Sequence, residues 1–387
     1  MDGDALRDVL ATVREFVREQ VVPREAEIDD KDQVPDPLRQ AARAMGLYGF
    51  AIPEQYGGLG LSMYEEAQLV FELGYTTPAL RSLFGTNNGI AGHVLLEGAT
   101  AEQRARWLPQ LAAGEITAAF ALTEADAGSD PGGLRTVARR DGDHWVIDGS
   151  KRFITNAPVA DMFMVFARTD PDAAPSRGIT CFLVPRESTG LSVGPKDQKM
   201  GQFGAWTADV VLNGVRVPDD AVVGGAAGVN QGYAIAMRCL AHGRVHIAAL
   251  CVGMAERLVD ETVQYARSRR QSGRAIASFQ LVQGLIADSV TDHYAGRSLV
   301  LDVARRYDDG SDRRVGPAVA KYFASEMVGR VADRAVQVHG GSGYMRGVAV
   351  ERFYRDARLF RIYEGTSQIQ QVIIAKSVVG EAANESA

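Results

Sequence analysis

An acidic residue stands at the edge of a predicted helix near the C-terminal end of the chain. Glu364 lies in the stretch RIYEGTSQIQ, where Ser367 and Gln370 have the spacing of a capping box and predict a helix that begins just past the acid. The positive end of that helix would lower the pKa of a nearby carboxylate. A general base near neutral pH instead needs a raised pKa and a dry apolar pocket. On local sequence alone, a solvated acid is the simpler interpretation.

Two further stretches carry groups that suit a flat cofactor. FALTEADAGSD places Thr123 and Ser129 in a turn-prone loop, whose backbone and hydroxyl donors suit a heterocycle or a phosphate. GSKRFITN places Phe153 two residues before Thr155, so a strand would put both side chains on one face. From composition alone, two ordinary strand edges are the simpler interpretation.

Two histidines have the spacing of ligands on one helix face. His242 and His246 are four residues apart in a segment with a helical pattern. The glutamate of an H-E-x-x-H motif is absent, and no third ligand is near in the sequence. We therefore favour polar packing inside a helix bundle and predict no metal site.

Other motifs with a known chemistry are absent. The chain has no G-x-G-x-x-G after a predicted strand, no Walker A loop and no G-x-S-x-G. Cys181, Cys239 and Cys251 are far apart, so the sequence predicts neither a disulfide framework nor a cysteine zinc site.

Length and charge narrow the class of protein. The 387 residues exceed the roughly 250 that one hydrophobic core usually holds, so we expect two or three domains, or subunits that share cores. The net charge of −6 argues against nucleic acid as a partner. No run of 18 uninterrupted apolar residues predicts a membrane span, and the acidic N-terminus is unlike a signal peptide. We expect a cytoplasmic protein, in which the sequon at Asn384 has no meaning.

The periodicity of apolar residues divides the chain into three parts. Residues 1–117 have helical spacing, with capping boxes at Ser62 and Thr100. Residues 118–226 hold short runs of β-branched and aromatic residues, with a hairpin signal at Asn213-Gly214, and predict a β-barrel or sandwich domain. Long helical patterns fill 227–387 and predict a four-helix bundle, with a tail that frays. The predicted class is α+β multidomain, in the order α, β, α.

Five motifs stand in the order and approximate spacing of the acyl-CoA dehydrogenases, and the chain resembles that family over nearly its whole length. The motifs are ALTEADAGSD, GSKRFITN, KMGQFGAWTADVVLNGVRVP, QVHGGSGY and RIYEGTSQIQ. The resemblance implies a flavoenzyme with FAD that oxidises an acyl-CoA thioester between Cα and Cβ, in fatty acid metabolism or β-oxidation. It implies electron transfer to an electron-transfer flavoprotein and a homotetramer built as a dimer of dimers.

The resemblance also assigns roles to residues. Glu364 matches the base that removes the α-proton, while the β-hydrogen leaves as hydride to N5 of FAD. The position that holds the base in some members is Gly243 here, so Glu364 has no rival. Flavin contacts are expected from Phe120, Leu122, Thr123, Ser129, Phe153, Ile154, Thr155, Thr366 and Gln368. The adenosine diphosphate part of a neighbouring subunit's FAD is expected at Arg269, Gln271, Gln280, Gln337, Gly340 and Gly341. Substrate contacts are expected from Ser129, Arg244, Tyr363 and Gly365.

Two other functions are compatible with the same motifs. One keeps the fold and changes the acceptor, giving an oxidase or a flavin monooxygenase that reacts with oxygen. The other is a catalytically silent binding subunit, which the intact Glu364 and flavin motifs disfavour.

Overall fold

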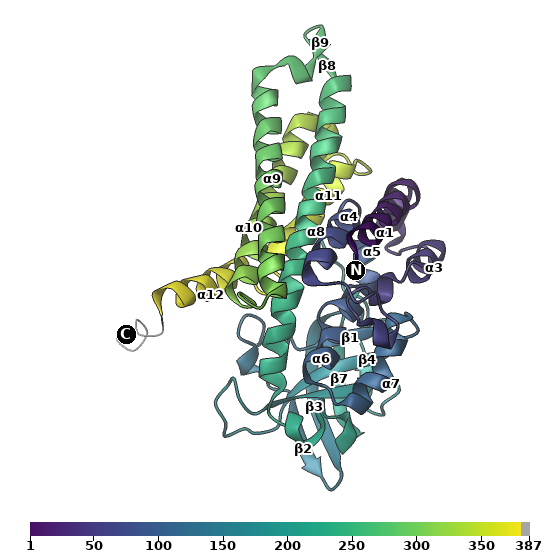
Figure 1. Ribbon diagram of the computed structural model, residues 1–387, viewed down its shortest axis with the longest axis vertical. Coiled ribbons are helices and arrows are strands. Elements are labelled where there is room, and N and C mark those ends of the chain that lie inside the picture. Colours follow the sequence, from purple (N-terminus) through teal and green to yellow (C-terminus); the bar gives the residue numbers. More distant parts are fainter. Residues whose placement is uncertain (381–387) are drawn as a thin grey trace.

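The computed structural model describes residues 1–380, which form a helical N-terminal part, a central sheet and a long helical C-terminal part (Figure 1). The order α, β, α predicted from the sequence is confirmed. Residues 381–387, which hold most of the tail expected to fray and the sequon at Asn384, lie outside the described residues.

The N-terminal part consists of short helices that begin at the predicted caps. Ser62 and Glu65 form both halves of a capping box at α4, and Thr100 and Gln103 do so at α7. The helices are α1 (Gly3–Glu15), α2 (Glu25–Lys31), α3 (Asp36–Ala44), α4 (Met63–Gly74), α5 (Pro78–Asn88), α6 (Ala91–Gly98) and α7 (Ala101–Ala112).

The middle part is one curled, mixed sheet of seven strands rather than two stacked layers. Its order is β1-β4-β2-β3-β7-β6, with β5 paired to β4, and β1 runs parallel to β4. The strands are β1 (Ala118–Ala121), β2 (Val137–Asp141), β3 (His144–Thr155), β4 (Met162–Arg168), β5 (Ile179–Pro185), β6 (Leu191–Val193) and β7 (Thr207–Pro218).

The hairpin predicted at Asn213-Gly214 is wrong. Strand β7 runs straight through this pair and stays paired with β3. Between the pairs Ile147–Val215 and Gly149–Leu212, β7 advances by one residue more than β3, which is a β-bulge. Gly214 has φ +63° and so absorbs the extra residue. An Asn-Gly pair supplies the positive φ that either a tight turn or a bulge requires.

The C-terminal part is built on three long helices that match the predicted long helical patterns. The elements are α8 (Gly232–Ser268), α9 (Gln280–Asp308), α10 (Val315–His339), α11 (Ala349–Ala357) and α12 (Ser367–Val379), and the short strands β8 (Arg270–Gln271) and β9 (Arg274–Ala275) join α8 to α9. The strands β8 and β9 lie at the end of the bundle far from the sheet (Figure 1). Among the described helices, α8 alone is long and apolar enough to cross a membrane. However, 83% of its most apolar 18-residue segment is buried inside the fold. It is a core helix.

Helix α8 joins the three parts because it contributes to two hydrophobic cores. In one core, Val70 of α4 packs with Leu250 of α8 and with residues of α10. In the other, Leu95 of α6 and Met164 of β4 pack with Cys239 of α8. The parts therefore share cores, and their junction lies along α8.

Candidate active site

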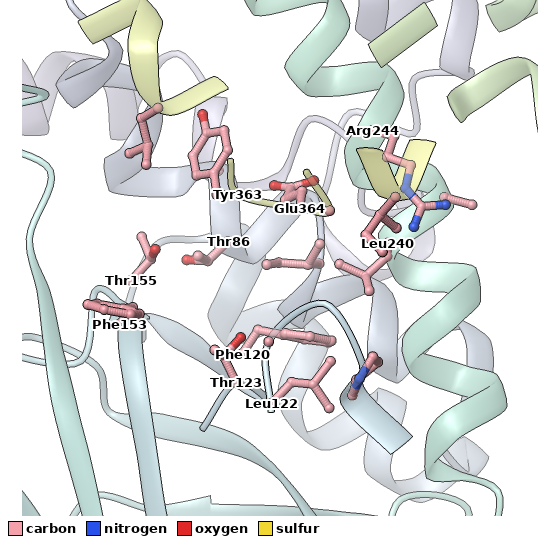
Figure 2. Close-up of a pocket in the computed structure, with 18 of the residues that line it drawn as sticks. Thr86, Phe120, Leu122, Thr123, Phe153, Thr155, Leu240, Arg244, Tyr363 and Glu364 are labelled. Carbon is pink, nitrogen blue, oxygen red and sulfur yellow. The ribbon is translucent and has the colours of Figure 1, made fainter. Parts of the chain in front are cut away.

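A cavity of about 1020 Å³ opens where the helices, the sheet and the segment before α12 meet. Figure 2 shows Glu364 and Tyr363 facing it from one side and Phe120, Leu122 and Thr123 from the other. The structure brings together these predicted residues: Phe120, Leu122, Thr123, Ser129, Phe153, Ile154, Thr155, Arg244, Tyr363, Glu364 and Gly365. Residues far apart in the sequence thus form one site.

The backbone around Glu364 is held in an unusual conformation. Glu364 has φ +52° and Gly365 has φ +91°, and a positive φ is costly for a residue with a side chain. Two side chains stabilise this turn by hydrogen bonds to its carbonyl groups. Lys321 Nζ donates to the Gly365 carbonyl over 2.7 Å, and Gln370 Nε2 donates to the same carbonyl over 2.9 Å and to that of Glu364 over 3.2 Å.

The capping box predicted at Ser367 and Gln370 is wrong by one residue. Thr366 is the N-cap of α12, and its hydroxyl accepts from the Ile369 N–H over 3.3 Å. The Gln370 side chain is therefore free to hold the turn at Glu364. Helix α12 does begin just past the acid, as predicted.

Burial decides the electrostatics of Glu364. Its Oε2 is buried and has no hydrogen-bond partner among the described residues. Burial raises the pKa of Glu364 above its usual value, although the cations Arg81, Lys321 and Arg244 oppose that shift. Desolvation thus outweighs the nearby cations, and the simple interpretation of a solvated acid is wrong.

The sheet supplies the wall of the cavity opposite the acid. Phe153 has φ +58° and is 59% exposed, whereas Ile154 beside it is buried. A β-bulge lies between Lys151 and Ile154, where β3 advances by one residue more than β7. Phe153 and Thr155 lie side by side at the cavity (Figure 2), as predicted, but the bulge rather than regular strand alternation presents them.

A buried ion pair between Lys151 and Glu124, which no sequence motif predicts, holds the loop after β1 against β3. Lys151 Nζ lies 2.7 Å from Glu124 Oε1 and 3.3 Å from the Leu122 carbonyl. Glu124 also accepts from the backbone N–H groups of Arg135 and Thr136. Burial lowers the pKa of Lys151 to about 8, and Glu124 opposes this shift. The pair holds Leu122 and Thr123 in place at the cavity.

The remaining predicted flavin residues lie elsewhere. A second group is exposed at the far end of the bundle, where Tyr265 stacks on His339 at 4.2 Å and joins the end of α8 to the end of α10. This group comprises Arg269, Gln271, Gln280, Gln337, Gly340 and Gly341. Thr366 is occupied as a helix cap, and Gln368 is exposed. The role of the second group at a neighbouring subunit stays a prediction.

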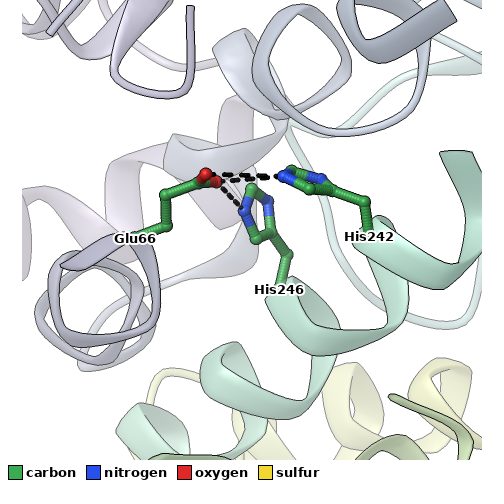
Figure 3. Close-up of side chains that lie close together, drawn as sticks. All are labelled: Glu66, His242 and His246. Atoms are coloured by element: carbon green, nitrogen blue, oxygen red, sulfur yellow. Dashed lines mark hydrogen bonds and ion pairs between the residues drawn. The ribbon is translucent and has the colours of Figure 1, made fainter. Parts of the chain in front are cut away.

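His242 and His246 meet a third polar group that lies far away in the sequence. Glu66 of α4 points at both rings (Figure 3). Its Oε2 lies 2.5 Å from His246 Nε2 and 3.3 Å from His242 Nε2, and all three side chains are buried. The sequence shows no signal for Glu66 beyond an acid in an apolar helix.

Family comparison agrees with the fold and the site along the whole chain. The acyl-CoA dehydrogenase N-terminal domain matches residues 3–115, the middle domain matches 119–215 and the C-terminal domain matches 230–379.

Curated relatives and solved structures match at similar identity. The chain is 36% identical over 366 residues to a 3-(aryl)acrylate reductase of Clostridium sporogenes, covering 95% of this chain and 96% of the relative. It is 37% identical over 349 residues to subunit CarC of the caffeyl-CoA reductase–Etf complex of Acetobacterium woodii, covering 90% and 91%. Butyryl-CoA dehydrogenase of Megasphaera elsdenii superposes with a TM-score of 0.93 at 31% identity, covering 98% and 100%. Glutaryl-coenzyme A dehydrogenase with glutaryl-CoA superposes with 0.92 at 32% identity, covering 98% and 97%.

The fold and the cavity define an FAD-dependent oxidoreductase. The chain belongs to the acyl-CoA dehydrogenase family. The residues at the cavity fit the cofactor, because the exposed Phe153 ring offers an apolar face and Thr123 and Thr155 offer hydroxyl groups beside it. The cavity volume of about 1020 Å³ reaches the upper end of the usual range for ligand pockets, about 300–1,000 Å³.

Proposed function

We propose that the protein removes two hydrogens from an acyl-CoA thioester and forms the trans-2-enoyl-CoA, with Glu364 as the base for the α-proton. One observation carries this proposal: the Glu364 carboxylate lies at a large cavity, and its Oε2 is buried with no partner among the described residues. A structural carboxylate in this position would be paired, because an unpaired buried charge is costly.

The residues around the cavity have separate roles in the proposed reaction. FAD, when bound, supplies the acceptor for the hydride from Cβ. Glu364 takes the proton from Cα, and its backbone N–H is expected to stabilise the negative charge that develops on the thioester oxygen. Lys321 and Gln370 hold the turn that aims both groups, through their hydrogen bonds to the Gly365 carbonyl. Phe153 and Thr155, which line the cavity, would contact the flavin ring when FAD is bound.

The partner that takes the electrons is proposed to be an electron-transfer flavoprotein. This rests on the relative named as a subunit of a caffeyl-CoA reductase–Etf complex. A dimer of dimers is also proposed, because the second group of predicted flavin residues is exposed at the far end of the bundle, away from this chain's own cavity.

One feature of the cavity favours a particular acyl group. Arg81 lines the cavity, is 9% exposed, and has a buried Nε with no partner among the described residues. Its Nη2 contacts His246, so the free Nε–H is the donor that favours a carboxylate, through a charge-assisted hydrogen bond. An acyl group that ends in a carboxylate is therefore the second candidate substrate, beside a neutral acyl group.

Anaerobic titration of the yellow protein tests the proposal. Acyl-CoAs that are straight, branched, aromatic or terminated by a carboxylate are added, and flavin absorbance is followed. The proposal expects bleaching by at least one of them and release of the enoyl-CoA. Bleaching by none contradicts it, and stoichiometric hydrogen peroxide under air would replace the flavoprotein partner with oxygen.

A further inference from the structure

Arg81 lies in a space that helix α5 leaves for it. Gly85 comes one turn after Arg81, and a Cβ at position 85 would lie 2.6 Å from Arg81 Nε and 2.7 Å from its Cζ. A Cβ at position 89 would lie 3.4 Å from Nη2. The two glycines therefore let the guanidinium lie along the helix, buried at the cavity wall.

His246 of α8 is the hydrogen-bond partner of this guanidinium. Arg81 Nη2 lies 3.4 Å from His246 Nδ1. Since a guanidinium has donors only, Nδ1 must carry the lone pair and Nε2 must carry the proton. That proton points at Glu66 Oε2, which lies 2.5 Å from Nε2. Glu66 thus selects the tautomer of His246 that can accept from Arg81.

The charges in this chain of contacts are consistent with that tautomer. Burial lowers the pKa of His246 to about 4, although Glu66 opposes the shift, so the imidazole is neutral. A protonated Glu66 would donate to Nε2 and leave a proton on Nδ1, facing the donors of Arg81. The contact with Arg81 therefore requires Glu66 as a carboxylate. Burial raises the pKa of Glu66, and the hydrogen bond from His246 opposes that shift and favours the carboxylate.

A metal ion is the alternative occupant of this cluster. The ligand atoms of Glu66, His242 and His246 lie within 4.8 Å of one another (Figure 3). A metal on His246 Nε2 would leave the proton on Nδ1, again facing Arg81. His242 Nδ1 is buried with no partner among the described residues, whereas a metal-bound histidine almost always donates its other N–H. Hydrogen bonding explains the cluster better than a metal does.

Without its partner on α8, Arg81 would have a strong reason to move. Among the residues that the structure describes, no ion pair within 4.0 Å joins Arg81 to Glu364, whose Oε2 is itself unpaired. A buried guanidinium and a buried carboxylate at one cavity gain from pairing, because each is then compensated. Such a pair would weaken the base, since a bound cation favours the carboxylate over its protonated form.

We propose that Glu66 and His246 position Arg81: they present an acceptor nitrogen to its guanidinium and hold that cation away from the carboxylate of Glu364. This rests on the proposed function, in which Glu364 is the base. Arg81 on α5, Lys321 on α10 and Arg244 on α8 are the cations that lower the pKa of Glu364. Arg81 has the largest effect of the three.

Two substitutions of one residue separate the two hydrogen bonds of His246. In His246→Gln, the side-chain amide N–H takes the place of Nε2–H and donates to Glu66, while no acceptor atom remains at the place of Nδ1, which faces Arg81. In His246→Asn, the amide oxygen takes the place of Nδ1 and still accepts from Arg81. We expect His246→Gln to move the acid limb of the kcat/KM–pH profile down by about one pH unit and to lower kcat about tenfold. His246→Asn is expected to keep the wild-type profile.

Two more variants complete the test. Adding Arg81→Leu to His246→Gln removes the released cation, so the acid limb should return to the wild-type pH or above. Glu66→Leu offers no acceptor to Nε2–H and so no longer favours this tautomer. It should move the limb down as His246→Gln does, and it replaces His246→Gln in the test if that variant does not fold. Thermal unfolding and flavin content establish that each variant is folded.

These measurements distinguish failure of the positioning role of His246 from failure of Glu364 as the base. An acid limb that stays in place or moves to higher pH in His246→Gln overturns the positioning role. The role is also overturned if His246→Asn shifts the acid limb as far as His246→Gln does. Stoichiometric zinc in the purified protein would overturn it too. An acid limb that survives in Glu364→Gln would instead show that the proposed base is wrong, whatever His246 does.

Discussion

Gly243 leaves the space that the Glu364 carboxylate occupies. A Cβ at position 243 would lie 2.4 Å from Glu364 Oε2 and 2.9 Å from the Ile90 side chain. The sequence offered Gly243 only as the position of a missing rival base. In the structure, the missing side chain at Gly243 leaves room for the carboxylate of Glu364, which lies in the turn before α12, to reach the cavity.

Replacing Gly243 by alanine therefore tests the packing of the base. The added methyl group must push the carboxylate aside, and a displacement of about 1 Å can cost about 100-fold in rate. We expect Gly243→Ala to reduce flavin at about one-hundredth of the wild-type rate in stopped-flow measurements. Gly284→Ala is the control, because nothing lies within 4 Å of a Cβ there. Equal rates in Gly243→Ala and the wild type would mean that the carboxylate acts from another position.

The pH dependence follows from the burial of Glu364. The base acts as the carboxylate, and burial raises the pKa of Glu364 above its usual 4.5. Activity should consequently be lost as the pH falls through a pKa higher than 4.5 and be fully present above it. A profile of kcat/KM against pH measures this pKa in the free enzyme. An acid limb at or below pH 4.5 would contradict the buried position.

Lys321 gives the profile a basic limb. Burial lowers the pKa of Lys321 to about 8, so the ammonium that holds the Gly365 carbonyl loses its charge above that pH. A neutral amine makes a weaker hydrogen bond, and the rate should fall as the pH rises through about 8. Lys321→Met is expected to be about tenfold slower at pH 7 and to lack this limb. Lys31→Met is the control, because Lys31 lies on the surface at the end of α2, and it should keep the wild-type profile. A basic limb that persists in Lys321→Met would mean that another group causes this limb.

Arg269 tests the second group of predicted flavin residues. It is exposed at the end of α8, where a guanidinium suits the pyrophosphate of a neighbouring subunit's cofactor. Arg269→Ala should purify with less than about half of the wild-type FAD per chain, because a charge-assisted hydrogen bond contributes about 1.5–3 kcal/mol. Arg306→Ala, at the other end of the bundle, is the control. Normal flavin content in Arg269→Ala would remove this residue from the cofactor site.

Local patterns predicted much of the fold. The capping boxes at Ser62 and Thr100 and the long helices after residue 232 formed as expected, since they depend on neighbours in sequence. Asn213-Gly214 was misread because a positive φ at glycine serves a bulge as readily as a turn. The cap of α12 was misplaced because Gln370, which has the right spacing, bonds instead to the turn at Glu364.

The site was predictable only where a motif marked it. Phe153 and Thr155 were predicted together because they share one short stretch, Glu364 was predicted because its motif matches a family position, and all three line the cavity. Arg81 and Glu66 act through His246, which is 165 and 180 residues away from them in the chain, and no local pattern links such positions. Their only sign in the sequence is a charged residue within an apolar helix.

The most direct test of the account is anaerobic mixing of Glu364→Gln with an acyl-CoA that bleaches the wild-type flavin. The amide keeps the size of the side chain but cannot take a proton, and loss of a general base typically costs about 10²–10⁴-fold. Glu364→Gln should have normal FAD content, show a spectral shift that reports acyl-CoA binding, and reduce its flavin at least about 100-fold more slowly. Bleaching at a near wild-type rate would contradict the account, because the proton would then have to leave through a group other than Glu364.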